Sequence, residues 1–242
     1  MHPRMHPDTP FRTVDLTYED VEQADSPLGP LRLRRYLSAD GQVGYEIHLN
    51  DVFLMATHGH SSESAMAELA YERLDGKRED LRVLVGGLGA GYTLKAALEL
   101  PGVARVTVAE ISPAVVDWNR RFFADYNGGV VDDPRAEVVV QDLADHIRDN
   151  EGAYDLALLD VDNGPGWLAS EVNDRLYDRV GLERTKRVVR PGGVVAVWSP
   201  MPNPPFWALF GRVFDEPESV DTTPQGRRVN EPGDTIYLGR RR

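Results

Sequence analysis

The chain contains no cysteine, and this absence removes disulfides, thiolate metal sites and thiol nucleophiles from consideration. It also lacks any apolar run approaching the roughly 20 residues that a membrane-spanning helix requires. The first residues, "MHPRMHPDTPFRTVDL", hold no apolar segment of the kind found in secretory signals. We therefore expect no membrane partner and a cytoplasmic location.

Basic residues are fewer than acidic residues in this sequence. The sequence has 27 lysine and arginine residues against 39 aspartate and glutamate residues, which gives a formal net charge of −12. Because an acidic surface repels a phosphate backbone, we expect no nucleic-acid partner. The charge balance is compatible with a small cationic substrate but does not demonstrate one.

Three parts can be distinguished along the 242 residues. Residues 1–15 are polar and contain proline, and we expect a flexible tail. Residues 16–60 are interpreted as a small N-terminal β unit, because "PLRLRRYLSA" and "VGYEIHLNDVFLMATH" resemble short strands separated by turn signals. Residues 61–242 are predicted to form one Rossmann-like nucleoside-binding domain.

The third part alternates apolar strands with helical segments. The strands are "LRVLVG", "ARVTVAEI", "AEVVVQDL", "YDLALLDV" and "VVAVWSP", and "DRLYDRVGLERTKRVV" is predicted as one helix. Continuous apolar strands are typical of a parallel sheet covered on both faces. The final segments "ESVDTT" and "TIYLGRR" predict an antiparallel hairpin at the sheet edge, and "MPNPPFW" before them is interpreted as a loop.

A glycine loop joins the first of these strands to a helix, in "VLVGGLGAGYTLKAALEL". Gly87, Gly89 and Gly91 allow a tight turn in which backbone N–H groups approach a ligand closely. Glycine also occurs in ordinary tight turns, so the loop alone is a weak signal. Glu110 ends the next strand, where a carboxylate can accept hydrogen bonds from ribose hydroxyls. Asp142 ends the strand after that, either to receive an adenine amino group or to cap a helix.

The glycine loop, Glu110 and Asp142 stand at three successive strand ends, and this arrangement favours a nucleoside pocket. Ile111 and Leu143, which directly follow the two carboxylates in the sequence, are predicted to line the same pocket. A nicotinamide cofactor is disfavoured, because its fingerprint Gly-x-Gly-x-x-Gly differs from the Gly-x-Gly-x-Gly found here. The loop, the acidic strand end and the terminal hairpin together resemble the class I S-adenosylmethionine-dependent methyltransferase fold. The expected cofactor is S-adenosylmethionine or a close relative, such as its decarboxylated form or methylthioadenosine.

Within that fold, residues 28–200 resemble the spermidine/spermine synthase family, through "VLVGGLGAGYTLKAAL", "VTVAEISPAVVDWNRRFF" and "YDLALLDVDNGPG". In that family an aspartate after the fourth strand acts on the attacking amine, and a second aspartate lies just downstream. The resemblance places Asp160 and Asp162 at these positions. A carboxylate there can hold a cationic amine and accept its proton. The alternative is that both residues only end a strand and begin a turn. The resemblance also implies a possible homodimer.

The sequence departs from the family at the residues that recognise amines. The family loop reads Gly-Gly-Gly-Asp-Gly-Gly, and its aspartate holds the amino end of decarboxylated S-adenosylmethionine; Ala90 takes that position here. Met66 and Ala67 likewise replace a Tyr and a His or Gln. We therefore predict a transferase that moves an alkyl group, with methyl favoured, to a small nucleophile. A true aminopropyltransferase and a non-catalytic nucleoside-binding protein stay as alternatives.

Four further residues are predicted near the substrate. His58 and His60 with Glu63 form a weak metal motif, and we expect no metal there because a third clear ligand is lacking. In the resembled fold this segment lies over the mouth of the site, so we place His60 and Glu63 at the substrate. Trp167 and Trp198 are placed in the acceptor pocket, although both are equally compatible with plain packing.

Overall fold

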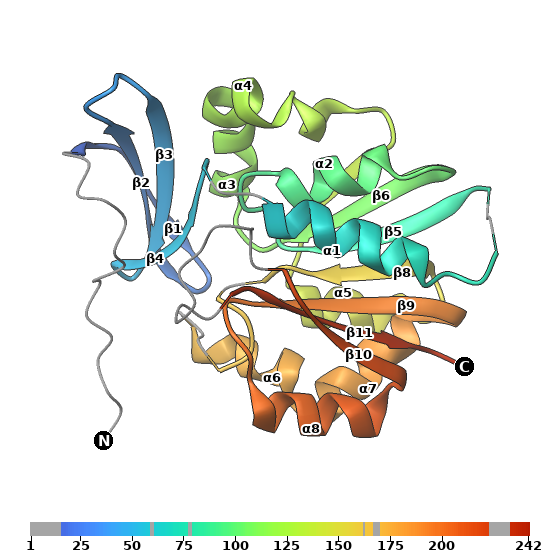
Figure 1. The fold of residues 1–242 in the computed structure, drawn as a ribbon. Coiled ribbons are helices and arrows are strands. Elements are labelled where there is room, and N and C mark those ends of the chain that lie inside the picture. Colours follow the sequence, from blue (N-terminus) through green and yellow to red (C-terminus); the bar gives the residue numbers. More distant parts are fainter. Residues whose placement is uncertain (1–15, 59–60, 77–78, 162, 167–169, 223–232) are drawn as a thin grey trace.

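The computed structural model describes residues 16–58, 61–76, 79–161, 163–166, 170–222 and 233–242. They form a four-stranded sheet near the N-terminus and a seven-stranded sheet in the rest of the chain (Figure 1). The predicted residues His60, Asp162 and Trp167, and the tail at 1–15, lie outside the described residues. Within them, no helix is long and apolar enough to cross a membrane.

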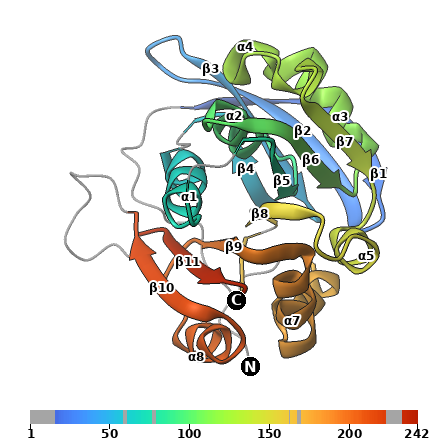
Figure 2. The same ribbon diagram turned by 90° about the vertical axis from the view of Figure 1, so that its right-hand side faces the viewer.

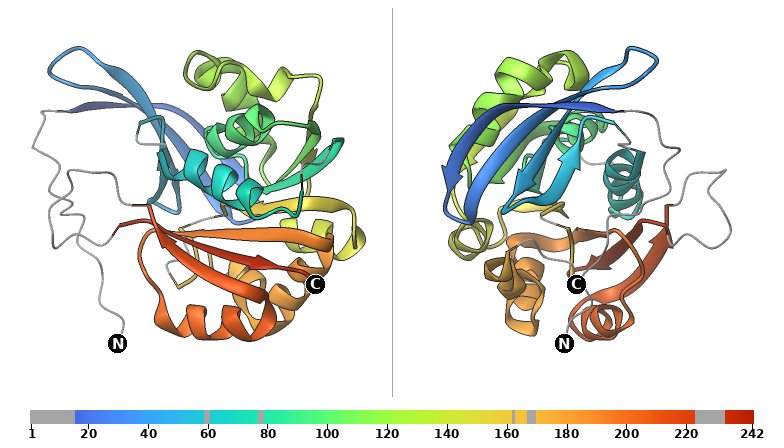
Figure 3. Two further views of the ribbon diagram at one scale, coloured as in Figure 1. Left: turned by 45° about the vertical axis from the view of Figure 1, so that its right-hand side comes forward. Right: turned by 90° about the vertical axis from the view of Figure 1, so that its left-hand side faces the viewer.

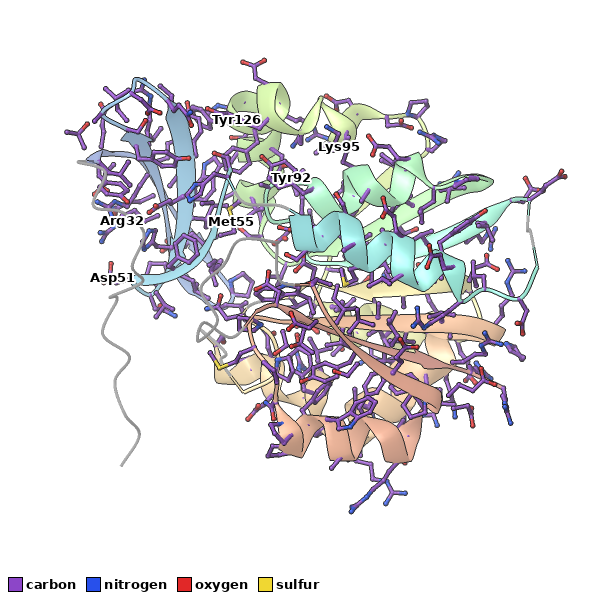
Figure 4. The ribbon with its side chains drawn as sticks, in the orientation of Figure 1. Arg32, Asp51, Met55, Tyr92, Lys95 and Tyr126 are labelled. Atoms are coloured by element: carbon purple, nitrogen blue, oxygen red, sulfur yellow. The ribbon has the colours of Figure 1, made fainter. Side chains whose placement is uncertain are left out.

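The N-terminal sheet is antiparallel throughout, and its strands lie side by side in chain order. They are β1 (Thr17–Ser26), β2 (Gly29–Leu37), β3 (Val43–Leu49) and β4 (Val52–Ala56). Buried Leu33 and Ile47 belong to the same core as the first helices of the larger domain. The opposite side carries charged pairs such as Arg32 and Asp51, 2.8 Å apart (Figure 4). One face of this sheet therefore packs against the rest of the molecule (Figure 3).

The large sheet has the order β10-β11-β9-β8-β5-β6-β7. The strands β5 to β9 run parallel, while β11 is antiparallel to both β9 and β10. The strand bounds are β5 Leu81–Gly86, β6 Val103–Glu110, β7 Ala136–Val140, β8 Tyr154–Leu159, β9 Val189–Ser199, β10 Asp215–Asp221 and β11 Thr235–Arg240. This arrangement confirms the predicted mostly parallel α/β sheet with its C-terminal antiparallel hairpin.

Helices cover both faces of this sheet (Figure 2). One face holds α1 (Ser61–Glu72), α2 (Tyr92–Glu99) and α3 (Pro113–Trp118); the other holds α5 (Leu143–Asp149), α7 (Arg179–Val188) and α8 (Pro204–Val213). In β5, Val83 and Val85 join the first core, whereas Leu84 between them joins the second. Because alternate side chains meet opposite layers, the strand is apolar at every central position.

Two predicted segments differ from the structure. The single helix expected from "DRLYDRVGLERTKRVV" is split into α6 (Asp174–Tyr177) and α7. Asp178 between them is extended, at φ −73° and ψ 173°, and its side chain accepts a 2.7 Å hydrogen bond from the Gly181 N–H, so it caps α7. The predicted loop "MPNPPFW" contains the start of α8, where Asn203 caps the helix and two prolines occupy its first turn.

Short helices complete the fold. After α3 the chain continues as a π-helix, η1 (Asn119–Phe123), and then as α4 (Ala124–Asn127). The 3₁₀ turns η2 (Val130–Asp132) and η3 (Glu171–Asn173) lie before β7 and before α6. A π-helical turn is rare and often occurs beside a functional site.

Candidate functional site

A cavity of about 280 Å³ opens at the carboxyl ends of the central parallel strands. Its other wall comes from the N-terminal sheet, including Leu31, Ile47 and Met55. In open α/β sheets this end of the strands is where ligands bind. Most of the residues predicted from the sequence line it, namely Glu63, Gly87, Gly89, Glu110, Ile111, Asp142, Leu143, Asp160 and Trp198.

The glycine loop forms the floor of this cavity. Gly87, Gly89 and Gly91 have φ angles of +82°, +49° and +83°, a left-handed conformation that favours glycine. A Cβ on Gly87 would lie 2.7 Å from the backbone oxygen of Asp160, so no larger residue fits between the two strand ends. Gly91 does not line the cavity; it is the N-cap residue of α2.

Two buried asparagines donate hydrogen bonds to backbone carbonyls of the glycine loop. Asn119 Nδ2 donates to the Gly89 carbonyl over 2.8 Å, and Asn127 Nδ2 donates to the Ala90 carbonyl over 2.8 Å. Asn127 Nδ2 also lies 3.0 Å from Asn119 Oδ1, which joins the two side chains. Neither asparagine was predicted from the sequence, where they carry no recognisable spacing. The π-helix η1 places Asn119 under the loop.

Glu110 ends β6 with its carboxylate buried and 7% of the residue exposed. One oxygen accepts from the Leu88 N–H over 2.9 Å, and the other from the Ser112 N–H over 2.8 Å. Burial raises the pKa of Glu110, and these backbone N–H groups act against that rise. A carboxylate offers about four acceptor positions, so this side chain keeps capacity for ligand hydroxyls.

Asp142 both caps a helix and lines the cavity. Its Oδ1 accepts from the Ala144 N–H over 2.9 Å and from the Asp145 N–H over 3.3 Å, at the start of α5. Its Oδ2 pairs with Arg175 at 2.6 Å. These contacts fix the orientation of the side chain, so the capping role and a place in the pocket wall coexist.

Asp160 follows β8 and accepts a 2.6 Å hydrogen bond at Oδ2 from the hydroxyl of Thr93. Burial raises the pKa of Asp160, while the Thr93 hydroxyl lowers it. Thr93 is itself buried and lines the cavity. The only sequence signal for it was a hydroxyl side chain in the first turn after the glycine loop.

Two more carboxylates reach the same cavity, Glu63 from α1 and Asp234 from the segment just before β11. Burial, together with the negative charges of Asp160 and Asp234, raises the pKa of Glu63 to about 7. Asp234 was missed from the sequence, because it comes from the C-terminal hairpin. Among the described residues that line the cavity, none is lysine or arginine. The chemistry of this wall favours a cationic ligand.

The wall nearest the N-terminal sheet is tied to the glycine loop. The Tyr92 hydroxyl donates to the Thr57 carbonyl over 2.7 Å, and Tyr92 and Met55 both line the cavity (Figure 4). His58 also lines it, with Nδ1 2.8 Å from the Tyr36 hydroxyl. At the other side, the indole nitrogen of Trp198 is buried without a hydrogen-bond partner among the described residues.

Comparison with known proteins gives one family and one fold. The model of the spermine/spermidine synthase domain matches residues 61–203. The structure of a spermidine synthase in complex with the transition-state analogue AdoDATO superimposes with a TM-score of 0.74 at 17% identity, covering 92% of this chain and 74% of that one. Human methyltransferase-like protein 13 in complex with SAH gives a TM-score of 0.55 at 21% identity, over 75% of this chain and 82% of that one. These likenesses support the predicted Rossmann-like methyltransferase fold.

Curated relatives match over part of their length. Polyamine aminopropyltransferase 2 of Pseudomonas aeruginosa is 33% identical over 119 residues, which is 48% of this chain and 32% of the relative. Putrescine N-methyltransferase 1 of Nicotiana tabacum is 32% identical over 114 residues, which is 47% of this chain and 29% of the relative. The matches thus span about a third of each of these proteins. With the domain match extending over more than half of its residues, the chain belongs to the spermine/spermidine synthase family.

Proposed function

We propose that this protein transfers a methyl group from S-adenosylmethionine to the nitrogen of a small amine. One observation carries the proposal: a glycine-loop cavity has carboxylates in its wall, while residue 90, beside the loop glycines, is alanine. The carboxylates suit a cationic acceptor. The alanine leaves the ammonium of decarboxylated S-adenosylmethionine without an anionic partner at that point, and burying an unpaired charge is costly. The ammonium of the intact cofactor is partly balanced by the carboxylate of the same molecule, so the loss of that partner is less severe for it.

At the nucleoside end, the glycine loop and Glu110 would hold the adenosine. Gly87 and Gly89 supply backbone close to the ligand, and Glu110 accepts from the ribose hydroxyls. Ile111 and Leu143 pack on either side of the adenine, with Asp142 at its edge. The relatives support this arrangement, since proteins of this fold have been solved with SAH and with AdoDATO.

At the acceptor end, Asp160 would act on the amine. An ammonium must lose a proton before its nitrogen can attack. Asp160 takes that proton, and the free lone pair then forms a bond to the methyl carbon while the carbon–sulfur bond breaks. The bonding electrons stay on sulfur, which becomes the neutral thioether of S-adenosylhomocysteine. A buried carboxyl with a raised pKa is suited to this step, because it is a stronger base than a solvated one.

The residues outside the described part of the chain keep the roles predicted from the sequence. Asp162 would act on the amine together with Asp160, and His60 and Trp167 would contact the acceptor. Trp198 contributes from the cavity wall, because its indole N–H has no hydrogen-bond partner among the described residues and can donate to a ligand.

Aminopropyl transfer is the second candidate, and a specific feature favours it. The carboxylate groups of Glu63 and Asp234 line the cavity, whereas lysine and arginine are absent from its described wall. The carboxylate of intact S-adenosylmethionine would meet no cationic side chain there. Decarboxylated S-adenosylmethionine carries no such group, and its ammonium could pair with one of these acids instead of with residue 90.

Transfer assays on the wild type and Asp160→Asn test the proposal. The substrates are a diamine acceptor with either S-adenosylmethionine or its decarboxylated form, and the products are distinguished by mass. Methyl transfer that disappears in Asp160→Asn, with S-adenosylhomocysteine binding retained, supports the proposal. Aminopropyl product from the wild type would establish the second candidate. Ligand binding without turnover on any amine would indicate a non-catalytic nucleoside-binding protein.

A further inference from the structure

Ser112 has a buried hydroxyl with no partner among the residues that the structure describes. The residue is 2% exposed, and its Oγ has no hydrogen bond within the described part of the chain. A hydroxyl is rarely left in this condition, since a buried polar group without a partner costs stability. Ser112 also lines the candidate cavity, two residues after Glu110. The position of this unused group suggests a ligand.

The usual structural role of such a serine does not account for it. Ser112 stands at the N-cap position of α3, directly before Pro113, where a serine side chain commonly caps the helix. Its side chain makes no cap hydrogen bond. Its backbone N–H instead donates to Glu110 Oε1 over 2.8 Å, which holds the two residues together at the end of β6.

We propose that the Ser112 hydroxyl binds a ribose hydroxyl of the adenosine ligand, as the partner of Glu110. This inference rests on the nucleoside site proposed above. A ribose hydroxyl both donates and accepts, whereas an ionised carboxylate only accepts. Glu110 accepts the hydrogen bond of the ribose hydroxyl, and Ser112 donates to its oxygen after rotation about the Cα–Cβ bond. Ser112 thereby increases the preference of the site for ribose over deoxyribose ligands beyond the preference that Glu110 alone would give.

Calorimetric titration with methylthioadenosine and with its 2′-deoxy and 3′-deoxy analogues tests this role. Ser112→Ala should bind methylthioadenosine about threefold to tenfold more weakly than the wild type, the factor that one neutral hydrogen bond supplies. For the analogue that lacks the contacted hydroxyl, the two proteins should bind equally. Equal affinity of wild type and Ser112→Ala for methylthioadenosine would overturn the inference, as would the same loss for all three ligands.

Thr235→Val provides the matched control. Thr235 is also 2% exposed, and its hydroxyl has no hydrogen-bond partner among the described residues, but it does not line the cavity. Thr235→Val should leave the affinities for all three ligands unchanged.

Thermal unfolding without ligand separates a binding role of Ser112 from a structural one. Ser112→Ala should melt at the wild-type temperature or above it, because the substitution removes an unsatisfied buried group. A clearly lower melting temperature would show that the hydroxyl serves the fold, and would overturn the inference. If the wild type binds none of the ligands, the nucleoside site itself is refuted.

Discussion

Thr93 holds Asp160 by a hydrogen bond of 2.6 Å from its hydroxyl to Oδ2. The two residues are 67 positions apart, and the fold brings them together because α2 begins just after the glycine loop while Asp160 follows the neighbouring strand β8. The bond stabilises the ionised form of a buried carboxyl. Thr93 is therefore a positioning residue for the group that we assign to the amine.

Replacing Thr93 by valine should change the pH dependence of transfer. The lost hydrogen bond raises the pKa of Asp160, so the carboxylate needed for proton acceptance forms only at higher pH. A hydrogen bond to a charged group contributes about 1.5–3 kcal/mol and one pKa unit corresponds to about 1.4 kcal/mol, so the acid limb of kcat/KM should move up by roughly 1–2 pH units. Thr93→Ser should restore the original limb. An unchanged profile in the valine variant would contradict this role.

Removing Asn127 should weaken the glycine loop. In Asn127→Ala the Ala90 carbonyl and Asn119 Oδ1 both lose their donor, and an unsatisfied buried group costs about 1–3 kcal/mol. We expect lower unfolding free energy together with weaker binding of S-adenosylhomocysteine. Asn150→Ala is the control, since Asn150 Nδ2 donates to the His146 carbonyl over 2.8 Å at the end of α5, outside the cavity wall. If both variants bind equally well, the loop does not depend on Asn127.

Glu63 should make the protein less stable as the pH rises. Its pKa is about 7 in the folded chain and near 4.5 for a solvated glutamate, so the folded state binds the proton more tightly. Stability is then fully present below about pH 4.5 and falls as the pH rises towards 7, by roughly 1–3 kcal/mol in total. Thermal unfolding of Glu63→Gln should lack this contribution and exceed the wild type at pH 8. Parallel pH curves for the two proteins would refute the assignment.

The identity of residue 90 should decide between the two forms of the cofactor. Ala90→Asp introduces a carboxylate beside the loop, so we expect tighter binding of decarboxylated S-adenosylmethionine and weaker binding of the intact form. Ala90→Asn has nearly the same shape without the charge and serves as the control. The interpretation of Ala90 fails if the aspartate and asparagine variants show the same preference between the two ligands.

The sheet could be predicted from the sequence because its strands are covered on both faces. Val83, Leu84 and Val85 are all buried, which makes the strand a continuous apolar run. The first strand of the N-terminal sheet, "TYEDVEQADS", is by contrast mostly polar and exposed, and nothing in its pattern distinguishes it from a loop. The sequence does not predict the break between α6 and α7 at Asp178. The residues on both sides have helical propensity, and the break depends on a single side chain that caps α7.

The site residues could be predicted only where a local sequence pattern indicates a binding role. The glycine loop and the strand ends at Glu110 and Asp160 have such signals in the sequence. Thr93, Asn127 and Asp234 do not, since each matters through contacts or charges contributed by distant segments. Ser112 directly precedes Pro113 at the start of a helix, a position typical of a cap, and only the packing around it shows that its hydroxyl has no partner among the described residues.

Calorimetric titration of the wild type with S-adenosylmethionine, its decarboxylated form and methylthioadenosine distinguishes methyl transfer from aminopropyl transfer. We expect methylthioadenosine to bind, and the intact cofactor to bind more tightly than the decarboxylated one. The reverse preference would contradict methyl transfer and point to aminopropyl transfer. Failure of all three ligands to bind would contradict the nucleoside pocket on which every assignment here depends.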